Sequence, residues 1–130
     1  MITGYVNSER EAVVSIAVYG PQGEMREIEA VIDTGFSGDL TLPSAVVAAL
    51  RLNVLANEHL TLADGSEVAS EVCPAIVIWD GQPQIIEVST LETDALVGMG
   101  LLEGHHLNIH VAVGGRVIIE PSSTAQPPSA

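Results

Sequence analysis

The chain is poor in cysteine, aromatic residues and positive charge, and each shortage excludes a class of structure or partner. Cys73 is the single cysteine, so neither an intrachain disulfide nor a zinc site of the cysteine type can form. Lysine and arginine together number four against 17 aspartates and glutamates, which gives a formal net charge of −13 at pH 7. Because no basic patch is available, we do not expect nucleic acid or an anionic membrane surface as a partner.

Long apolar runs are also absent, although apolar residues are plentiful. They make up 47% of the 130 residues, enough for the core of one domain, whereas aromatic residues make up only 3%. The core must therefore consist of Val, Ile, Leu and Ala. No run approaches the ~20 residues needed to span a bilayer, and the N-terminus from Met1 to Val6 lacks the pattern of a signal peptide. With a single cysteine, these features predict a cytoplasmic protein.

Short apolar segments separated by Gly, Pro and Asp predict a mainly β domain with one or two short helices. The expected strands are Glu11 to Tyr19, Met25 to Ile32, Leu40 to Leu42, Ala75 to Trp79, Gln84 to Val88, Ala95 to Val97, Leu107 to Val113 and Arg116 to Glu120. A hairpin with an Asp64-Gly65 tip is expected between Leu60 and Ala69.

One helix is expected from about Ala45 to Leu52, with Ser44 as its N-cap, and one helical turn between Gly98 and Glu103. The predicted domain covers residues 1–120. Residues 121–130 are rich in Ser, Thr, Gln and Pro, and we expect them to form a disordered tail.

The segment from Val31 to Gly38 joins an apolar strand end to a carboxylate, a hydroxyl and a glycine. Val31 and Ile32 lead directly into Asp33-Thr34-Gly35, which places a charged side chain at a buried strand end. A carboxylate in that position is costly unless hydrogen bonds or a chemical role compensate. For the tripeptide alone, an ordinary turn that closes a hairpin is the simpler interpretation.

Three segments, taken in order, resemble the retropepsin-like aspartic proteases, and most closely their small bacterial members. The first is Val31 to Gly38, followed by Leu40-Thr41-Leu42-Pro43 and a short helix. About 25–30 residues later, the hairpin from Leu60 to Ala69 stands where the family has its glycine-bearing flap. Leu96-Val97-Gly98 then matches the two apolar residues and the glycine that precede a short helix in the family. The resemblance covers roughly Val14 to Val113 and implies a closed-barrel, retropepsin-like fold.

This resemblance implies an aspartic endopeptidase that needs no metal or organic cofactor. Hydrolysis by this class uses two carboxylates around one water, one as general base and the other as general acid. Because the chain has a single Asp-Thr-Gly, the second carboxylate must come from a second copy. The implied enzyme is a homodimer with Asp33 of each subunit at the two-fold axis, acting on a peptide or protein bound as an extended strand.

The resemblance also gives roles to the neighbouring residues. Thr34 would brace the two loops across the axis, and Gly35 would let the backbone approach the substrate. The flap tip would be formed by Ala63, Asp64, Gly65 and Ser66, and the Asp33 loop would be supported from behind by Leu96, Val97 and Gly98. Either the N-terminal strand or the hairpin from Leu107 to Glu120 could form the dimer sheet.

Phe36 departs from the Ala or Ser that is common after the triplet in the best-known members. Its ring could narrow a subsite or occupy the cleft, so the alternative function is a catalytically weak or inactive dimer that binds peptides on the same fold. Ser37 resembles small hydrogen-bonding residues near this loop, and we assign it no catalytic role. It is not part of a Gly-x-Ser-x-Gly elbow, because Asp39 replaces the last glycine.

Other patterns receive ordinary structural interpretations. Gly98-Met99-Gly100 imitates a dinucleotide-binding loop, but an alternating strand follows where a long helix would be required. His106, Asn108 and His110 share one face of the strand from Leu107, which favours a solvent-facing row over a metal site. We expect His59 to be an ordinary surface residue and Cys73 to be a small buried one.

Overall fold

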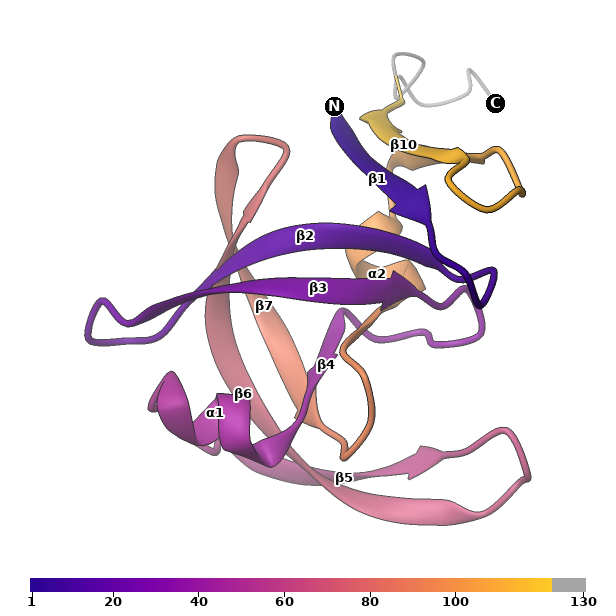
Figure 1. Ribbon diagram of the computed structural model, residues 1–130. Helices are drawn as coiled ribbons and strands as arrows, with labels where there is room; N and C mark the ends of the chain where they lie inside the picture. Colours follow the sequence, from indigo (N-terminus) through magenta and orange to yellow (C-terminus); the bar gives the residue numbers. More distant parts are fainter. Residues whose placement is uncertain (123–130) are drawn as a thin grey trace, which may run out of the picture.

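The computed structural model describes residues 1–122, which form ten strands and two short helices (Figure 1). The strands are β1 (Ile2–Val6), β2 (Ala12–Tyr19), β3 (Met25–Ile32), β4 (Leu40–Leu42), β5 (Ala56–Thr61), β6 (Glu67–Trp79), β7 (Gln82–Thr90), β8 (Leu96–Val97), β9 (His105–Ile109) and β10 (Arg116–Pro121). The helices are α1 (Ser44–Ala49) and α2 (Met99–Leu102). The prediction of a mainly β fold with one or two short helices is confirmed.

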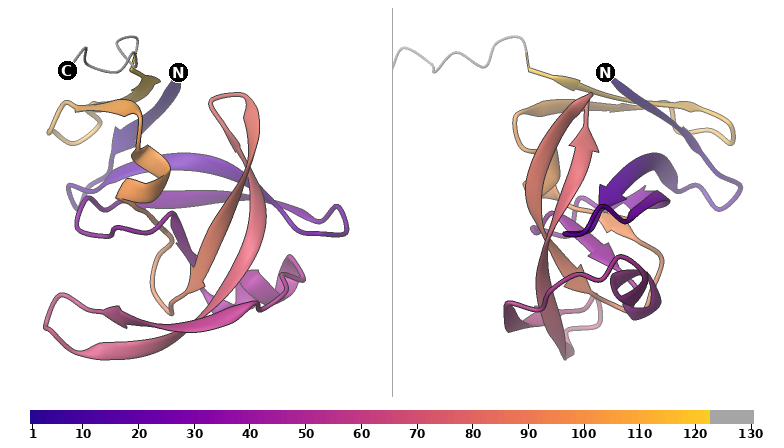
Figure 2. Two further views of the ribbon diagram at one scale, coloured as in Figure 1. Left: turned by 180° about the vertical axis from the view of Figure 1, so that it is seen from behind. Right: turned by 90° about the vertical axis from the view of Figure 1, so that its left-hand side faces the viewer.

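Six of the strands form a closed ring. The strands hydrogen-bond in the order β5-β6-β7-β4-β8-β3-β2-β1-β10-β9, and an additional pairing between β6 and β2 closes β6, β7, β4, β8, β3 and β2 into the ring. The β5–β6 hairpin and the small sheet of β1, β10 and β9 extend from it (Figure 2). Closure removes free edges from the body of the fold, since the only edge strands in this sheet order are β5 and β9.

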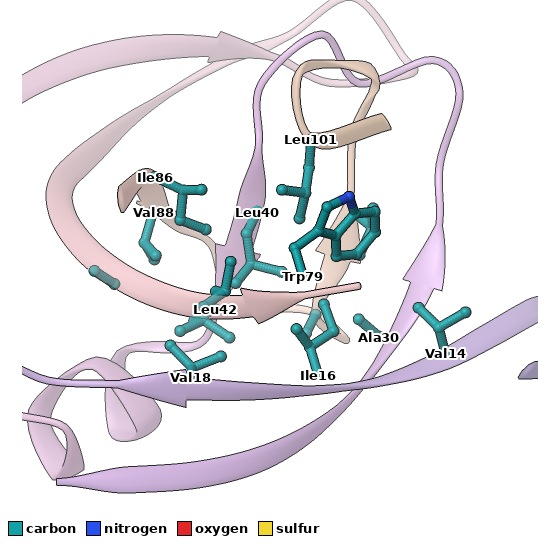
Figure 3. Packing of buried hydrophobic residues seen from close by; sticks show 14 of the residues in the cluster. Val14, Ile16, Val18, Ala30, Leu40, Leu42, Trp79, Ile86, Val88 and Leu101 are labelled. Carbon is teal, nitrogen blue, oxygen red and sulfur yellow. The ribbon is translucent and has the colours of Figure 1, made fainter. Parts of the chain in front are cut away.

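The core lies inside this ring and is aliphatic, with one large aromatic side chain. Along β2, Val14, Ile16 and Val18 are buried while Ser15 between them is exposed, as the period of a strand requires. These side chains pack with Leu40 and Trp79 from other strands (Figure 3). Removing such a side chain from water contributes about 1.5–3 kcal/mol per residue, so the abundance of small and medium apolar residues compensates for the scarcity of aromatic ones.

The predicted cap of the first helix is wrong. Pro43 occupies the N-cap position with no side-chain capping hydrogen bond, and Ser44 is the first helical residue. The N–H of Ser44 is instead satisfied by Glu92, whose Oε1 accepts it at 2.6 Å. The helix is also shorter than predicted, because Arg51 has a φ of 55° and turns the chain into the left-handed region.

Two strand predictions also needed correction. The expected strand from Ala75 to Trp79 and the returning arm of the flap hairpin are one continuous strand, β6. On one edge of β6, Pro74 faces Glu87 of β7. On the other edge it lies in the gap between the residues that pair with β5, which end at Val72, and those that pair with β2, which begin at Ile76, so its missing N–H is tolerated there. Strand β9 ends at Ile109, before the predicted Val113, because the chain then folds back with Gly115 donating to Ala112 O.

The structure describes the first two residues of the predicted tail, 121 and 122. Pro121 closes β10, and the N–H of Ser122 donates to Gly104 O at 2.9 Å. Residues 123–130 of the predicted tail lie outside the described residues. Within residues 1–122, neither helix has the length or apolar character needed to cross a membrane.

Leu40 should be a strong determinant of stability, because it is fully buried at the centre of the ring. We expect Leu40→Ala to lower the free energy of unfolding by about 2–5 kcal/mol, since both transfer energy and packing are lost. Leu55→Ala is the matched control, because Leu55 is 73% exposed, and it should change stability by no more than about 0.5 kcal/mol. Urea unfolding at one protein concentration measures both. Equal losses for the two variants would contradict this description of the core.

Candidate active site

Asp33 stands immediately after the last residue of β3 and is held by three hydrogen bonds. Its backbone N–H donates to Val97 O at 2.8 Å, and its backbone oxygen accepts the N–H of Phe36 at 3.1 Å. Its carboxylate oxygen Oδ1 accepts the N–H of Gly35 at 2.9 Å. The side chain is half-buried, so the second carboxylate oxygen remains available for chemistry while the first fixes the orientation of the group.

The short strand β8 positions this loop from both sides. It runs parallel to β3, with Ile32 opposite Val97, and antiparallel to β4, with Leu40 opposite Val97. Val97 is fully buried, and Leu96 is half-buried. Because β3 and β4 are the strands that enter and leave the Asp33 loop, their common neighbour fixes the distance between the two ends of the loop.

The residues that follow β8 hydrogen-bond to the loop itself. The N–H groups of Gly98, Met99 and Gly100 donate to the backbone oxygens of Asp39, Phe36 and Gly38 at 3.0, 2.7 and 2.9 Å, respectively. Three consecutive donors thus satisfy three carbonyl groups of an irregular segment, which limits its movement. The structure therefore brings together the predicted loop and the segment predicted to lie behind it.

Gly98 allows this close approach because it has no side chain. A Cβ at this position would lie 2.7 Å from Phe36 O, 2.5 Å from Cδ2 of the Phe36 ring, and closer still to Gly38 O. A Cβ on Gly38 would lie 2.5 Å from Cζ of the same ring. The half-buried Phe36 side chain therefore lies against two glycines, and these contacts hold its ring close to the backbone of the loop.

A groove with a volume of about 830 Å³ lies next to Asp33. The Asp33 loop contributes Asp33, Gly35, Phe36 and Ser37 to it. Strand β5 and the turn that follows it contribute the residues from His59 to Ala63. The β5–β6 hairpin projects toward the side on which β3 ends (Figure 1). Thr34 is exposed and is not part of the groove lining, and within residues 1–122 its side chain makes no hydrogen bond.

The tip of the β5–β6 hairpin is a tight turn around Gly65. Gly65 has a φ of 86°, a value that favours glycine, and its N–H donates to Leu62 O at 2.9 Å. Asp64 Oδ1 accepts the hydroxyl of Ser66 at 2.6 Å and its N–H at 2.9 Å. Both bonds lower the pKa of Asp64, and the bond from the Ser66 hydroxyl has the larger effect. Of the predicted tip residues, Ala63 lines the groove, whereas Asp64, Gly65 and Ser66 do not.

Eight lining residues were not among the predicted site residues: Thr41, His59, Leu60, Thr61, Leu62, Leu91, Glu92 and Thr93. His59, expected to be an ordinary surface residue, is exposed but faces the groove. Strand alternation could not have singled out this wall, because five consecutive residues from His59 to Ala63 line the groove. The segment from Leu91 to Thr93 carries no signal either, because its position depends on the return of the chain from β7 to β8.

Glu92 is the one acidic residue among these additional lining residues. Its Oε1 accepts the Ser44 N–H, and this backbone bond, with a further bond to the Ser44 side chain, lowers the pKa of Glu92. The carboxylate is therefore charged at a pH at which an ordinary glutamate is partly protonated.

The remaining candidate groups lie apart from the groove. Cys73 is fully buried, and burial raises the pKa of its thiol, as expected for a core residue and not for a nucleophile. His106, Asn108 and His110 are exposed, as the strand pattern predicted. Within the described part of the chain, no group of three or more His, Cys, Asp or Glu side chains could hold a metal ion.

Comparison with solved structures identifies the fold. The chain is similar to a retropepsin-like aspartic protease from Rickettsia conorii, with a TM-score of 0.57 and 16% identity over 94% of this chain and 91% of that one. It is also similar to EIAV protease complexed with the inhibitor HBY-793, with a TM-score of 0.54 and 15% identity over 75% of this chain and 89% of that one. No protein-family model and no curated protein matches the chain. The fold is retropepsin-like.

Gly98→Ala should disrupt the support of the Asp33 loop, because the added methyl group would collide with the backbone of Phe36 and Gly38. We expect a loss of about 1–3 kcal/mol in unfolding free energy, typical of an overpacked site. Ser37→Ala is the control, since Ser37 lies in the same loop and is exposed, and it should cost less than about 0.5 kcal/mol. Guanidinium unfolding measures both, and wild-type stability of Gly98→Ala would show that the contact is not constrained.

Proposed function

We propose that the chain is an aspartic endopeptidase that acts as a homodimer, with one Asp33 carboxylate from each subunit. The observation that carries the proposal is the position of Asp33, at a braced strand end and on the wall of a groove that the β5–β6 hairpin also lines. The retropepsin-like fold supports the assignment to hydrolases. A groove bordered by the edge strand β5 suits an extended peptide, because an edge strand offers unpaired N–H and C=O groups.

The proposed reaction uses one ionised and one protonated Asp33 around a single water. The ionised carboxylate takes a proton from the water while the water oxygen attacks the peptide carbonyl carbon. The protonated carboxyl group gives its proton to the carbonyl oxygen. Collapse of the tetrahedral intermediate breaks the C–N bond, and the amine leaves with a proton from the dyad. Two neighbouring carboxylates ionise in separate steps, which provides the acid and the base at one pH.

The requirement for a second copy follows from the number of available carboxylates. Asp33 is the only acidic residue of its loop that lines the groove, and Glu92, the other acidic lining residue, belongs to the β7–β8 connection and is oriented by the N–H of Ser44. Thr34 is exposed beside Asp33 and has a free hydroxyl within the described chain, which suits a contact with the same loop of a partner. A symmetric pair would bring both Asp33 side chains to one axis.

Asp33→Asn should abolish cleavage of a mixed peptide library, because an amide can neither accept the proton from water nor donate one to the carbonyl. We expect kcat/KM to fall by at least about 10³-fold. Asp94→Asn is the matched control, since Asp94 is exposed and lies outside the groove lining, and it should retain activity. Mass spectrometry of the products between pH 4 and 7 measures cleavage, and sedimentation measures the dimer.

A mixing experiment tests whether two Asp33 residues share one site. Addition of excess Asp33→Asn protein should inhibit the parent enzyme, because subunit exchange places most parent chains in mixed dimers that contain one carboxylate. Activity proportional to the amount of parent protein, or undiminished cleavage by Asp33→Asn alone, would refute the shared site.

Phe36→Ala distinguishes turnover from the alternative of peptide binding without cleavage. The Phe36 ring lies against Gly38 and Gly98 on the groove wall, which supports a role in shaping a subsite. We therefore expect the variant to keep Asp33-dependent cleavage with an altered preference for the residue next to the scissile bond. If instead the parent binds peptides intact and only Phe36→Ala cleaves them, Phe36 blocks turnover. Cleavage-site profiling of both proteins on one library provides the measurement.

A further inference from the structure

The groove beside Asp33 has a one-sided charge. Its lining includes two carboxylates, Asp33 and Glu92, and no lysine or arginine. The other ionisable lining residue is His59, on the opposite wall. Because the whole chain carries a formal charge of −13, the surrounding surface cannot reverse the sign of the potential in the groove, and an approaching cation is attracted from a distance.

Glu92 is exposed, and a hydrogen bond orients its carboxylate without neutralising it. Its Oε1 accepts the Ser44 N–H at 2.6 Å, so one oxygen orients the carboxylate. A carboxylate has about four acceptor sites on two oxygens, and within residues 1–122 no lysine or arginine forms an ion pair with Glu92. The group is therefore a preorganised anion with acceptor capacity left over. The hydrogen bonds from Ser44 also lower the pKa of Glu92, so it stays charged in mild acid.

The residues next to Glu92 suit the stem of a long cationic side chain. Leu91 and Leu96 are half-buried and line the same groove. Lysine and arginine place their methylene groups along apolar surface and extend their charge to a polar partner. A groove lined by both apolar side chains and a carboxylate offers both parts of this interaction, whereas an acidic or short polar side chain would gain neither.

We propose that Glu92 is a specificity-determining residue that selects a lysine or arginine side chain of an extended peptide lying in this groove. This inference rests on the proposed protease function and adds its substrate class: polypeptides that carry a basic residue near the cleaved bond. The positive charge of such a substrate is complementary to the negative charge of the protein, in which lysine and arginine together number only four. Glu92 acts in binding and takes no part in the proton transfers assigned to Asp33.

The test uses one cleavable peptide from the library, resynthesised with lysine, norleucine or glutamate at each position flanking the scissile bond. Norleucine matches the apolar stem of lysine without the charge. We expect one position at which lysine gives about ten-fold higher kcat/KM than norleucine, mainly through a lower KM, and at which glutamate is the poorest. Raising NaCl from 0.05 to 0.5 M should reduce the lysine advantage, because exposed charges are screened.

Glu92→Gln isolates the charge, because the glutamine oxygen can still accept the Ser44 N–H. This variant should lose most of the lysine advantage, and Glu92→Lys should invert it in favour of glutamate. Glu103→Gln is the control, since Glu103 is exposed and lies outside the groove lining, and it should keep the advantage. Urea unfolding establishes that each variant folds.

The outcomes separate the inference from the proposed function. If cleavage depends on Asp33 but no position prefers lysine, or if the preference survives Glu92→Gln, the inference fails and the protease assignment stands. If cleavage does not depend on Asp33, the protease assignment fails. Calorimetric binding of the lysine and norleucine peptides to the Asp33→Asn protein then decides the role of Glu92, and equal affinities would overturn it.

Discussion

The insertion of β8 between β3 and β4 is the contact on which the site depends. Two residues pair in parallel with one strand and antiparallel with the other, and the next three N–H groups bind carbonyl groups of the intervening loop. An irregular loop that carries a carboxylate would otherwise have few fixed hydrogen bonds. Here its two ends and its middle are tied to one short segment, so the orientation of Asp33 is set by backbone geometry and not by side-chain packing alone.

The groove is assembled from segments that are far apart in the sequence. The Asp33 loop, strand β5 and the connection from β7 to β8 meet because the ring of six strands closes through the pairing of β6 with β2. Each segment brings a different chemistry. The loop contributes a carboxylate and an aromatic ring, β5 contributes an edge with free backbone groups, and the connection contributes a second, oriented carboxylate. Binding and chemistry can therefore vary separately.

Much of this arrangement could be predicted from the sequence, because it depends on local patterns. Asp33-Thr34-Gly35 after an apolar strand and Leu96-Val97-Gly98 before a helical turn are both contiguous signals, and the structure brings them together. The continuity of β6 through Pro74 and the position of Glu92 could not be predicted. Both depend on which strands are neighbours in space. Pro74 is tolerated because one edge of β6 has no partner strand at that residue, and Glu92 replaces the predicted Ser44 cap because the β7–β8 connection passes helix α1.

The continuity of β6 has a mechanical consequence. From Val72 onward this strand pairs with β7 and belongs to the ring, whereas from Glu67 to Glu71 it pairs with β5 alone. The hairpin is thus a two-stranded ribbon that is attached to the ring at one end only. The pairing of β6 with the ring strand β7 begins at Val72, so bending of the hairpin beyond that residue would break no pairing within the ring. The hairpin is held together by the cross-strand pairs between β5 and β6. Because β5 also lines the groove, the same pairs that stiffen the hairpin shape the groove wall.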